Sequence, residues 1–212
     1  MSAREQNHET AVKNTYNKLA HNYEHRWHDY VWTTLRYLSG RVDLKGTEAV
    51  LDVGCGTGVL EELLLKRWPG LSITGVDISE EMLTVAGEKQ KLSPSLAFLQ
   101  ANASDLPFES ERFDTVVCAN CFHYFEQPGQ TLIEMKRVLK KGGRLVLLDW
   151  CRDYLVCRIC DVVLKMLDPA HKECYSLAQA EKLFTESGMK VSEKAKFRFG
   201  LIWGLMVLES IQ

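Results

Sequence analysis

The sequence predicts an α/β fold with a doubly wound, mostly parallel sheet of seven strands. Apolar runs that suit strands alternate along the chain with segments of helical periodicity, as in sheets whose parallel strands are joined by right-handed crossovers. A glycine-rich turn joins the first of these strands to the helix that follows it. The last two strands are separated by only a short connection, so we expect an antiparallel hairpin at the sheet edge.

The first segment, 1–45, is expected to form a helical arm ahead of the first strand. Its apolar and aromatic residues recur at helical spacing, which is typical of an amphipathic helix. They are Tyr16, Leu19, Ala20, Tyr23, Trp27, Tyr30 and Val31.

The segment 46–150 is expected to contain five strands of the sheet. The first, 48–53, leads through the glycine turn into a helix over 59–68, which a Pro-Gly pair ends. The second, 72–78, is followed by a helix from Ser79 whose first turn carries two glutamates, as the helix macrodipole favours.

The next strand covers 96–101, and the fourth, 114–119, is an almost unbroken apolar run that is typical of a strand buried on both faces. A helix over 130–140 is expected to stop at Gly142 and Gly143. The fifth strand then covers 144–149.

The segment 151–175 is helical but irregular in pattern, and we interpret it as a helical cap inserted after the fifth strand. Ser176 and Gln179 form a capping-box pattern that opens a helix ending at Gly188. The remainder of 176–212 supplies the edge hairpin. Its two strands are expected over 190–197 and 201–211.

Composition limits the possible partners and location. A chain of 212 residues with a formal net charge of −2 suits one domain over 1–212, and it lacks the basic surplus of a nucleic-acid-binding protein. The N-terminus has no secretory apolar region, and the longest apolar stretch is far shorter than the roughly 20 residues of a membrane span. We therefore expect a cytoplasmic protein with no membrane span and with reduced cysteines; its oligomeric state is open.

The glycine turn predicts a ligand site. Asp52 ends the first strand, and Gly54, Gly56 and Gly58 follow before the helix begins. Glycines allow a ligand to approach bare backbone, and the free N–H groups of a helix start face that ligand. The spacing G-x-G-x-G differs from the dinucleotide fingerprint, and the turn lacks the Lys-Ser/Thr pair of a P-loop.

Five ordered motifs resemble those of the class I S-adenosylmethionine-dependent methyltransferases, specifically the small type 11 group. The third has Asn102 where the family commonly has Asp, and the fifth has Lys141 where the family usually has Pro. The motifs cover 50–58, 75–79, 100–108, 113–124 and 137–145.

The resemblance implies the class I methyltransferase fold, with 46–150 as the cofactor-binding core and the N-terminal arm as a lid. It also implies S-adenosyl-L-methionine as cofactor and S-adenosyl-L-homocysteine as product. Asp77 would accept hydrogen bonds from the ribose hydroxyls, and Asn102 would address the adenine amino group. The residues expected at the cofactor are Tyr16, Tyr23, Asp52, Gly54, Cys55, Gly56, Asp77, Ile78, Met82, Asn102, Ala103 and Ala119.

Several of these residues also have a purely structural interpretation. Asp52 would brace the turn from below, and Ile78 and Met82 would be ordinary core residues instead of partners of the adenine ring. The aromatic stripe of the arm would pack on the sheet instead of contacting the cofactor, and for Trp27 the two interpretations are evenly balanced.

The acceptor is expected to be a small molecule. His123 is the candidate general base, because imidazole titrates near neutral pH; alternatively it shapes the floor of the pocket. The segment 120–123 is not the Asn-Pro-Pro-Tyr motif of methyltransferases that modify adenine and planar amides. The residues expected at the substrate are Trp27, His123, Tyr124, Trp150 and Tyr154, with Asp149 and His171 nearby.

No metal is expected. The pairs Cys118/Cys121 and Cys157/Cys160 have spacings that occur in zinc sites, but a thiol in a buried strand behaves as a small apolar group. Two functional alternatives remain at this stage. One is a nicotinamide-dependent oxidoreductase, and the other is a non-catalytic S-adenosylmethionine-binding protein.

Overall fold

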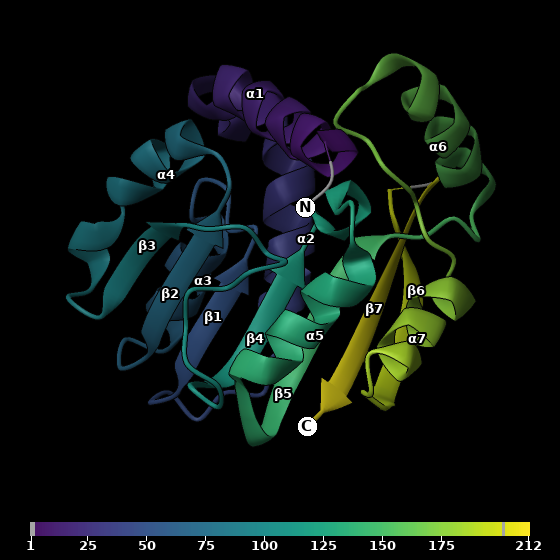
Figure 1. The fold of residues 1–212 in the computed structure, drawn as a ribbon. Helices are drawn as coiled ribbons and strands as arrows, with labels where there is room; N and C mark the ends of the chain where they lie inside the picture. Colours follow the sequence, from purple (N-terminus) through teal and green to yellow (C-terminus); the bar gives the residue numbers. More distant parts are fainter. Residues whose placement is uncertain (1–2, 201) are drawn as a thin grey trace.

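The computed structural model describes residues 3–200 and 202–212, which form a seven-stranded mixed sheet of order β3-β2-β1-β4-β5-β7-β6 (Figure 1). All neighbours from β3 to β5 pair in parallel, whereas β7 pairs antiparallel with both β5 and β6. The strands are β1 (Ala49–Val53), β2 (Ser72–Asp77), β3 (Leu96–Gln100), β4 (Phe113–Ala119), β5 (Leu139–Trp150), β6 (Val191–Phe199) and β7 (Trp203–Ile211). This topology confirms the predicted doubly wound sheet with its antiparallel edge hairpin.

Helices cover both faces of the sheet, because the central strands point apolar side chains to both sides. Leu51 of β1 joins a core with α5 and α7, while Val50 joins a second core with α2 and α3. The helices are α1 (Ala3–Arg26), α2 (His28–Arg41), α3 (Val59–Arg67), α4 (Glu80–Gly87), α5 (Pro128–Val138), α6 (Leu155–Leu167) and α7 (Leu177–Glu186). Two short 3-10 helices are η1 (Gln90–Leu92) and η2 (Phe122–Tyr124).

Local sequence signals explain where several helices begin. Ser79 caps α4, because its side chain accepts a hydrogen bond from the Met82 N–H at 3.1 Å. Ser176 and Gln179 form the predicted capping box at the start of α7. The N-terminal arm is two helices, because Trp27 between them leaves helical geometry with φ −114° and ψ 19°.

The boundary between α5 and β5 differs from the predicted one. The helix begins at Pro128 and ends at Val138, and Leu139 already pairs with Phe113 of β4. The register then shifts before Arg144, and Gly142 has a positive φ of 76° there. The glycines therefore serve a strand irregularity and do not stop the helix.

The predicted cap and hairpin are present with adjusted limits. Within 151–175 only α6 is a regular helix, and the chain after it is irregular until α7. β6 extends to Phe199, closer to the turn than expected, whereas β7 begins only at Trp203, later than expected. Gly200 has φ 60° in the turn between them. Leu201, the predicted first residue of the last strand, lies outside the described residues.

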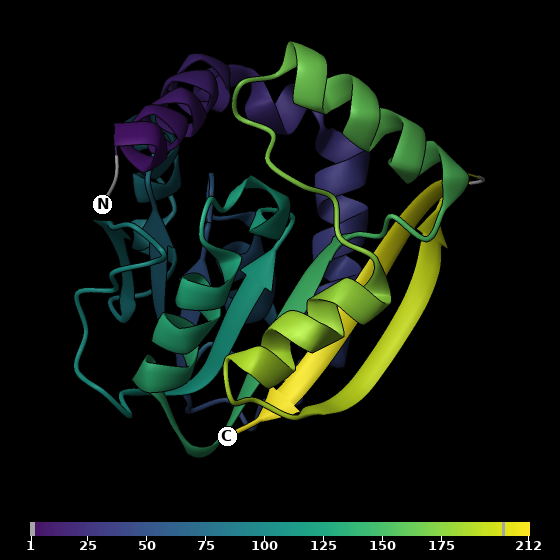
Figure 2. The same cartoon turned by 45° about the vertical axis from the view of Figure 1, so that its right-hand side comes forward.

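Figures 1 and 2 show α1 and α6 at the end of the sheet where the central parallel strands finish. α1 packs against α4, and α6 packs against β7. Among the described residues, none of the helices has the length and apolar content needed to cross a bilayer.

Candidate active site

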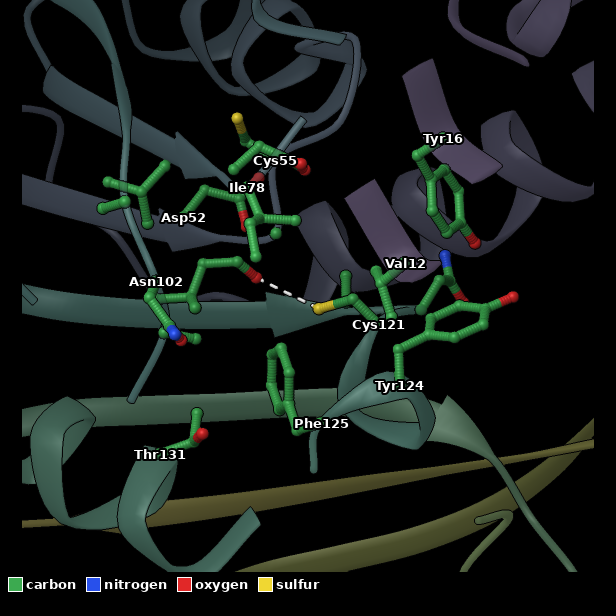
Figure 3. A pocket seen from close by; sticks show the side chains of 18 of the residues that line it. Val12, Tyr16, Asp52, Cys55, Ile78, Asn102, Cys121, Tyr124, Phe125 and Thr131 are labelled. Carbon is green, nitrogen blue, oxygen red and sulfur yellow. Dashed lines mark hydrogen bonds between the residues drawn. The ribbon is translucent and has the colours of Figure 1, made fainter. Parts of the chain in front are cut away.

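A cavity opens at the carboxyl ends of β1, β2 and β4. The strand order reverses between β1 and β4, and open α/β sheets bind ligands at such a switch point. Figure 3 shows the lining side chains converging from α1, the sheet and the segment after β4. The sequence-predicted residues that line it are Tyr16, Tyr23, Asp52, Gly54, Cys55, Asp77, Ile78, Asn102, Ala103, Ala119 and Tyr124.

Main-chain hydrogen bonds fix the glycine turn. The N–H groups of Gly54 and Cys55 donate to the Val76 carbonyl oxygen at 2.8 Å and 3.0 Å. The Gly56 N–H donates to Asp77 Oδ2 at 2.9 Å, so the turn is tied to the neighbouring strand end. Gly58 has φ 78° and precedes α3, whose first residue, Val59, lines the cavity.

Gly54 cannot carry a side chain in this turn. Its φ is 79°, and a Cβ there would overlap the side chain of Cys121, meeting Cys121 Cβ at 2.9 Å. Cys121 is held in place because its thiol donates to the Val53 carbonyl oxygen at 3.2 Å (Figure 3). The turn and the start of the segment after β4 therefore fit closely together.

Asp77 connects the turn to the start of α4. Its Oδ1 accepts from the Ser79 N–H at 2.9 Å, while Oδ2 accepts from Gly56. Burial raises the pKa of Asp77, and the main-chain N–H groups of Ser79 and Gly56 oppose that shift. Each carboxylate oxygen retains a further lone-pair direction for a ligand hydroxyl.

Two more acids are buried beneath the turn. Asp52 is 3% exposed and Glu61 of α3 is 0% exposed, and Asp52 Oδ1 and both Glu61 carboxyl oxygens lack hydrogen-bond partners. Burial, with a smaller effect of Asp77, raises the pKa of Asp52 to about 7. Burial and Asp52 raise the pKa of Glu61, and Lys89 opposes this. Of the two acids, Asp52 lines the cavity, and a cationic ligand next to it would favour the charged form of its carboxyl group.

Helix α1 forms the aromatic wall of the cavity. The Tyr16 ring lies edge-on to that of Tyr124, with centroids 5.3 Å apart (Figure 3). Burial raises the pKa of Tyr16 and of Tyr23, so both stay neutral. Asn102 donates to Glu9 Oε1 at 2.6 Å, which fastens α1 across the cavity.

Six sequence-predicted residues lie outside the cavity lining. Gly56 sits in the turn itself, and Met82 is buried within α4. Trp27 is 45% exposed beside the Arg26 guanidinium, and Tyr154 packs against Gly204. The last two, His123 and Trp150, belong to a buried aromatic group behind Tyr124.

His123 forms a buried dyad with Asp149 at the end of β5. Its Nδ1 lies 2.6 Å from Asp149 Oδ1, and its main-chain N–H donates to Oδ2 at 2.8 Å. The ring stacks on Trp150 at 4.3 Å, and its Nε2 has no hydrogen-bond partner. In the neutral tautomer whose Nδ1–H donates a hydrogen bond to Asp149, the lone pair lies on Nε2.

A second dyad lies 5.8 Å from the first between ring centroids. His171 Nε2 lies 2.9 Å from Asp161 Oδ1 of α6, and its Nδ1 also has no partner. Burial lowers the pKa of His171. The N–H groups of Lys172 and Glu173 donate to the His123 carbonyl oxygen, so the segment after α6 closes over His123.

The cysteines are all free thiols. Cys118 and Cys121 have their Sγ atoms 3.4 Å apart, whereas Cys157 is buried and bonds the Gly204 main chain at 3.3 Å. In the part of the chain that the structure describes, no three His, Cys, Asp or Glu side chains gather in a metal-binding arrangement.

The cavity also contains residues that sequence reasoning missed. His8 lies 2.8 Å from the Tyr124 carbonyl oxygen through Nε2, and Glu9 and Val12 extend the wall of α1. These positions continue the helical spacing of the aromatic stripe towards the N-terminus, which is the signal that could have identified them. Asn120, with φ 58°, and Phe125 complete the side beyond β4.

Comparison with known proteins agrees with this geometry. Residues 51–147 match the family described as a methyltransferase domain. A malonyl-[acyl-carrier protein] O-methyltransferase of Paenibacillus sp. is 41% identical over 107 residues, covering 48% of this chain and 39% of the relative. A demethylmenaquinone methyltransferase of Thermus thermophilus is 38% identical over 120 residues, covering 55% and 54%. The chain thus spans about half or less of the length of these curated relatives.

Solved structures share the fold. A putative methyltransferase of Haloferax volcanii, in complex with the Trm112 methyltransferase activator, has a TM-score of 0.82 at 20% identity, covering 92% of this chain and 96% of that one. A putative methyltransferase of Bacillus halodurans has a TM-score of 0.73 at 22% identity, covering 84% and 98%. The chain thus has the class I methyltransferase fold, and residues 51–147 match the methyltransferase domain family.

Proposed function

We propose that this protein transfers a methyl group from S-adenosylmethionine to a small-molecule acceptor. The observation that carries the proposal is the cleft at the switch point, where the glycine turn exposes main chain next to Asp77. In this proposal the Asp77 carboxylate holds the ribose hydroxyls, and the turn at Gly54 and Cys55 receives the methionine end. Asp52 lines the same cavity, and a ligand that carries a positive charge would favour the charged form of its carboxyl group.

The proposed acceptor is mid-sized and partly apolar. The cavity wall around Val12, Tyr16 and Phe125 offers apolar and aromatic surface. The curated relatives include methyltransferases named for demethylmenaquinone, ubiquinone biosynthesis and malonyl-[acyl-carrier protein]. A quinone-like ring or an acyl-chain metabolite is therefore the acceptor class to test first.

When bound, S-adenosylmethionine supplies a sulfonium-borne methyl group, which an acceptor lone pair attacks in line while the C–S electron pair returns to sulfur. The protein contributes orientation and exclusion of water. For an O–H or N–H acceptor, the proton would pass to His123 Nε2, with Asp149 holding the imidazole in the required tautomer. Because His123 lies behind Tyr124, we expect the Tyr124 ring to move when the acceptor binds.

Isothermal titration with S-adenosylmethionine and S-adenosylhomocysteine tests the cofactor site, and binding of neither would end the proposal. A fluorescence titration with NADH tests the oxidoreductase alternative, for which we expect no binding. Tritium transfer from methyl-labelled cofactor to a panel of hydroxylated quinone precursors tests turnover. Cofactor binding without transfer to any member of the panel would favour the non-catalytic alternative.

A further inference from the structure

Helix α6 presents an unusual outer face. Of the twelve large apolar side chains that are exposed among the described residues, six lie on this one helix. Met166 is 80% exposed and Leu167 is 76% exposed, so these side chains stand almost fully in solvent. The six are Leu155, Ile159, Val162, Val163, Met166 and Leu167. A contiguous apolar surface of this kind marks an interaction site.

The charges of α6 are arranged asymmetrically. Its single acid, Asp161, is 1% exposed. The Asp161 carboxylate is already paired with the His171 ring and with the Lys165 ammonium group. Arg158 is exposed on the outer side and has no ion-pair partner among residues 3–200 and 202–212. The outer face of α6 therefore combines apolar side chains with positive charge and carries no exposed carboxylate.

The tip of the β6–β7 hairpin extends this surface. Figure 2 shows the hairpin tip beside the start of α6. Ile202 is 63% exposed there, and the Arg198 guanidinium lies 5.5 Å from the centre of the Tyr154 ring, with no carboxylate paired to it in the described part of the chain. Nearby Asp153 is already paired with Lys196 at 2.8 Å. The hairpin tip thus repeats the combination of an exposed apolar side chain and an unpaired cation.

We propose that the outer face of α6, together with the hairpin tip, docks on a lipid bilayer that contains anionic headgroups. Helices that lie in a membrane interface bury an apolar face at the acyl boundary and place basic side chains among the headgroups. Anionic headgroups would supply the negative partners that Arg158 and Arg198 lack within the chain. A second copy of the chain fits less well, because two such faces would bring cations together without acids.

Docking in this way would turn the end of the sheet that holds the cavity towards the bilayer (Figures 1 and 2). The segment that follows α6 closes over His123, so the docked helix would lie next to the proposed acceptor side. An acceptor dissolved in the bilayer would then enter from the membrane. This last step rests on the proposed function, whereas the docking surface does not.

The test is co-sedimentation of the full chain with vesicles of phosphatidylcholine and phosphatidylglycerol at 3:1, and with phosphatidylcholine alone. We expect binding to the anionic vesicles and at least tenfold weaker binding for Met166→Asp. The matched control is Ile133→Asp, because Ile133 is 45% exposed on α5, away from this face. The control should bind as the unmodified protein does. No binding to anionic vesicles, or equal binding by the two variants, would overturn the proposal.

Sedimentation velocity without vesicles tests whether a second copy of the chain covers this face instead of a bilayer. A dimer that Met166→Asp dissolves would overturn the proposal and assign the face to a second copy. The same samples are titrated with S-adenosylmethionine in the absence of lipid. Vesicle binding without cofactor binding would contradict the proposed function but support the docking surface. Cofactor binding without vesicle binding would support the proposed function but overturn the docking surface.

Discussion

The two ends of the cavity are built in different ways. At the end formed by β1 and β2, main-chain groups of consecutive residues and one carboxylate, Asp77, define the site. At the end formed by β4, Tyr124 lines the cavity, and behind it buried side chains from distant segments meet, as in the His123–Asp149 dyad and its neighbour His171. The end proposed for the cofactor is thus a local structure, whereas the end proposed for the acceptor depends on how the cap packs.

The largest effect that separates the two ends is expected from Gly54→Ala. The added methyl group would overlap Cys121, and the backbone has φ 79°, so we expect a loss of roughly 3 kcal/mol in the free energy of unfolding and loss of cofactor binding. Gly56→Ala is the matched control. Gly56 also has a positive φ, 55°, but no atom lies within 4 Å of an added Cβ, so it should lose about 1 kcal/mol. Equal losses in urea unfolding would contradict this packing.

The next effect concerns binding at the cofactor end. Asp77→Ala should weaken S-adenosylmethionine binding at least about tenfold, or about 1.4 kcal/mol, because charge-assisted hydrogen bonds to the ribose are lost. Calorimetric titration measures this. Asp29→Ala serves as the control, because the Asp29 side chain is 95% exposed on α2. Unchanged affinity in Asp77→Ala would show that the ribose is bound elsewhere.

Replacing one of the two buried acids should stabilise the protein, and this effect on the free energy of unfolding should be smaller than the losses above. The pKa of Asp52 is raised to about 7, above its unfolded value near 4, so the ligand-free protein holds a proton that the unfolded chain releases. This contribution to stability is present at low pH and is lost as the pH rises through about 7. Glu61→Gln removes the second acid, with Asp77 and Lys89 as the remaining charged neighbours.

We therefore expect Glu61→Gln to be more stable than the unmodified protein by about 1 kcal/mol at pH 8, with a smaller difference at pH 5. Urea unfolding of the ligand-free protein at the two pH values measures it. Glu62→Gln on the same helix is the control, because Glu62 already pairs with Lys66 at the surface and should show little pH dependence. A Glu61→Gln variant that is less stable at pH 8 would contradict the account.

The smallest effect is expected for Trp27→Ala. The side chain is 45% exposed at the junction of α1 and α2, so unfolding should change by less than about 0.5 kcal/mol. Cofactor affinity should change by less than about twofold, because Trp27 does not line the cavity. A large loss of methyl transfer by Trp27→Ala at unchanged cofactor affinity would contradict this expectation and show that the acceptor site reaches this junction.

The sequence predicted the fold, and the position of the glycine turn next to Asp77, because these signals are local. Strand runs, the glycine turn and the capping box at Ser176 each depend on neighbouring residues. The limits of α5 could not be read in the same way, because strand pairing with Phe113 decides where the helix ends. Tertiary contacts there override the glycine signal.

The acceptor end was harder to predict for a physical reason. His123 and Tyr124 are adjacent in the chain, yet Tyr124 lines the cavity and His123 is sealed behind it by the segment after α6. The contacts of His8 and Glu9 likewise depend on how α1 crosses the sheet. Such placement follows from long-range packing, which residue patterns alone do not determine.

We propose above all that the cleft at the switch point holds the cofactor through Asp77 and the glycine turn. The most direct test is a crystal structure of the protein with S-adenosylhomocysteine. We predict the two ribose hydroxyls within hydrogen-bonding distance of the Asp77 carboxylate and the methionine end against Gly54 and Cys55. Density for the ligand at any other place, or a ribose turned away from Asp77, would contradict it.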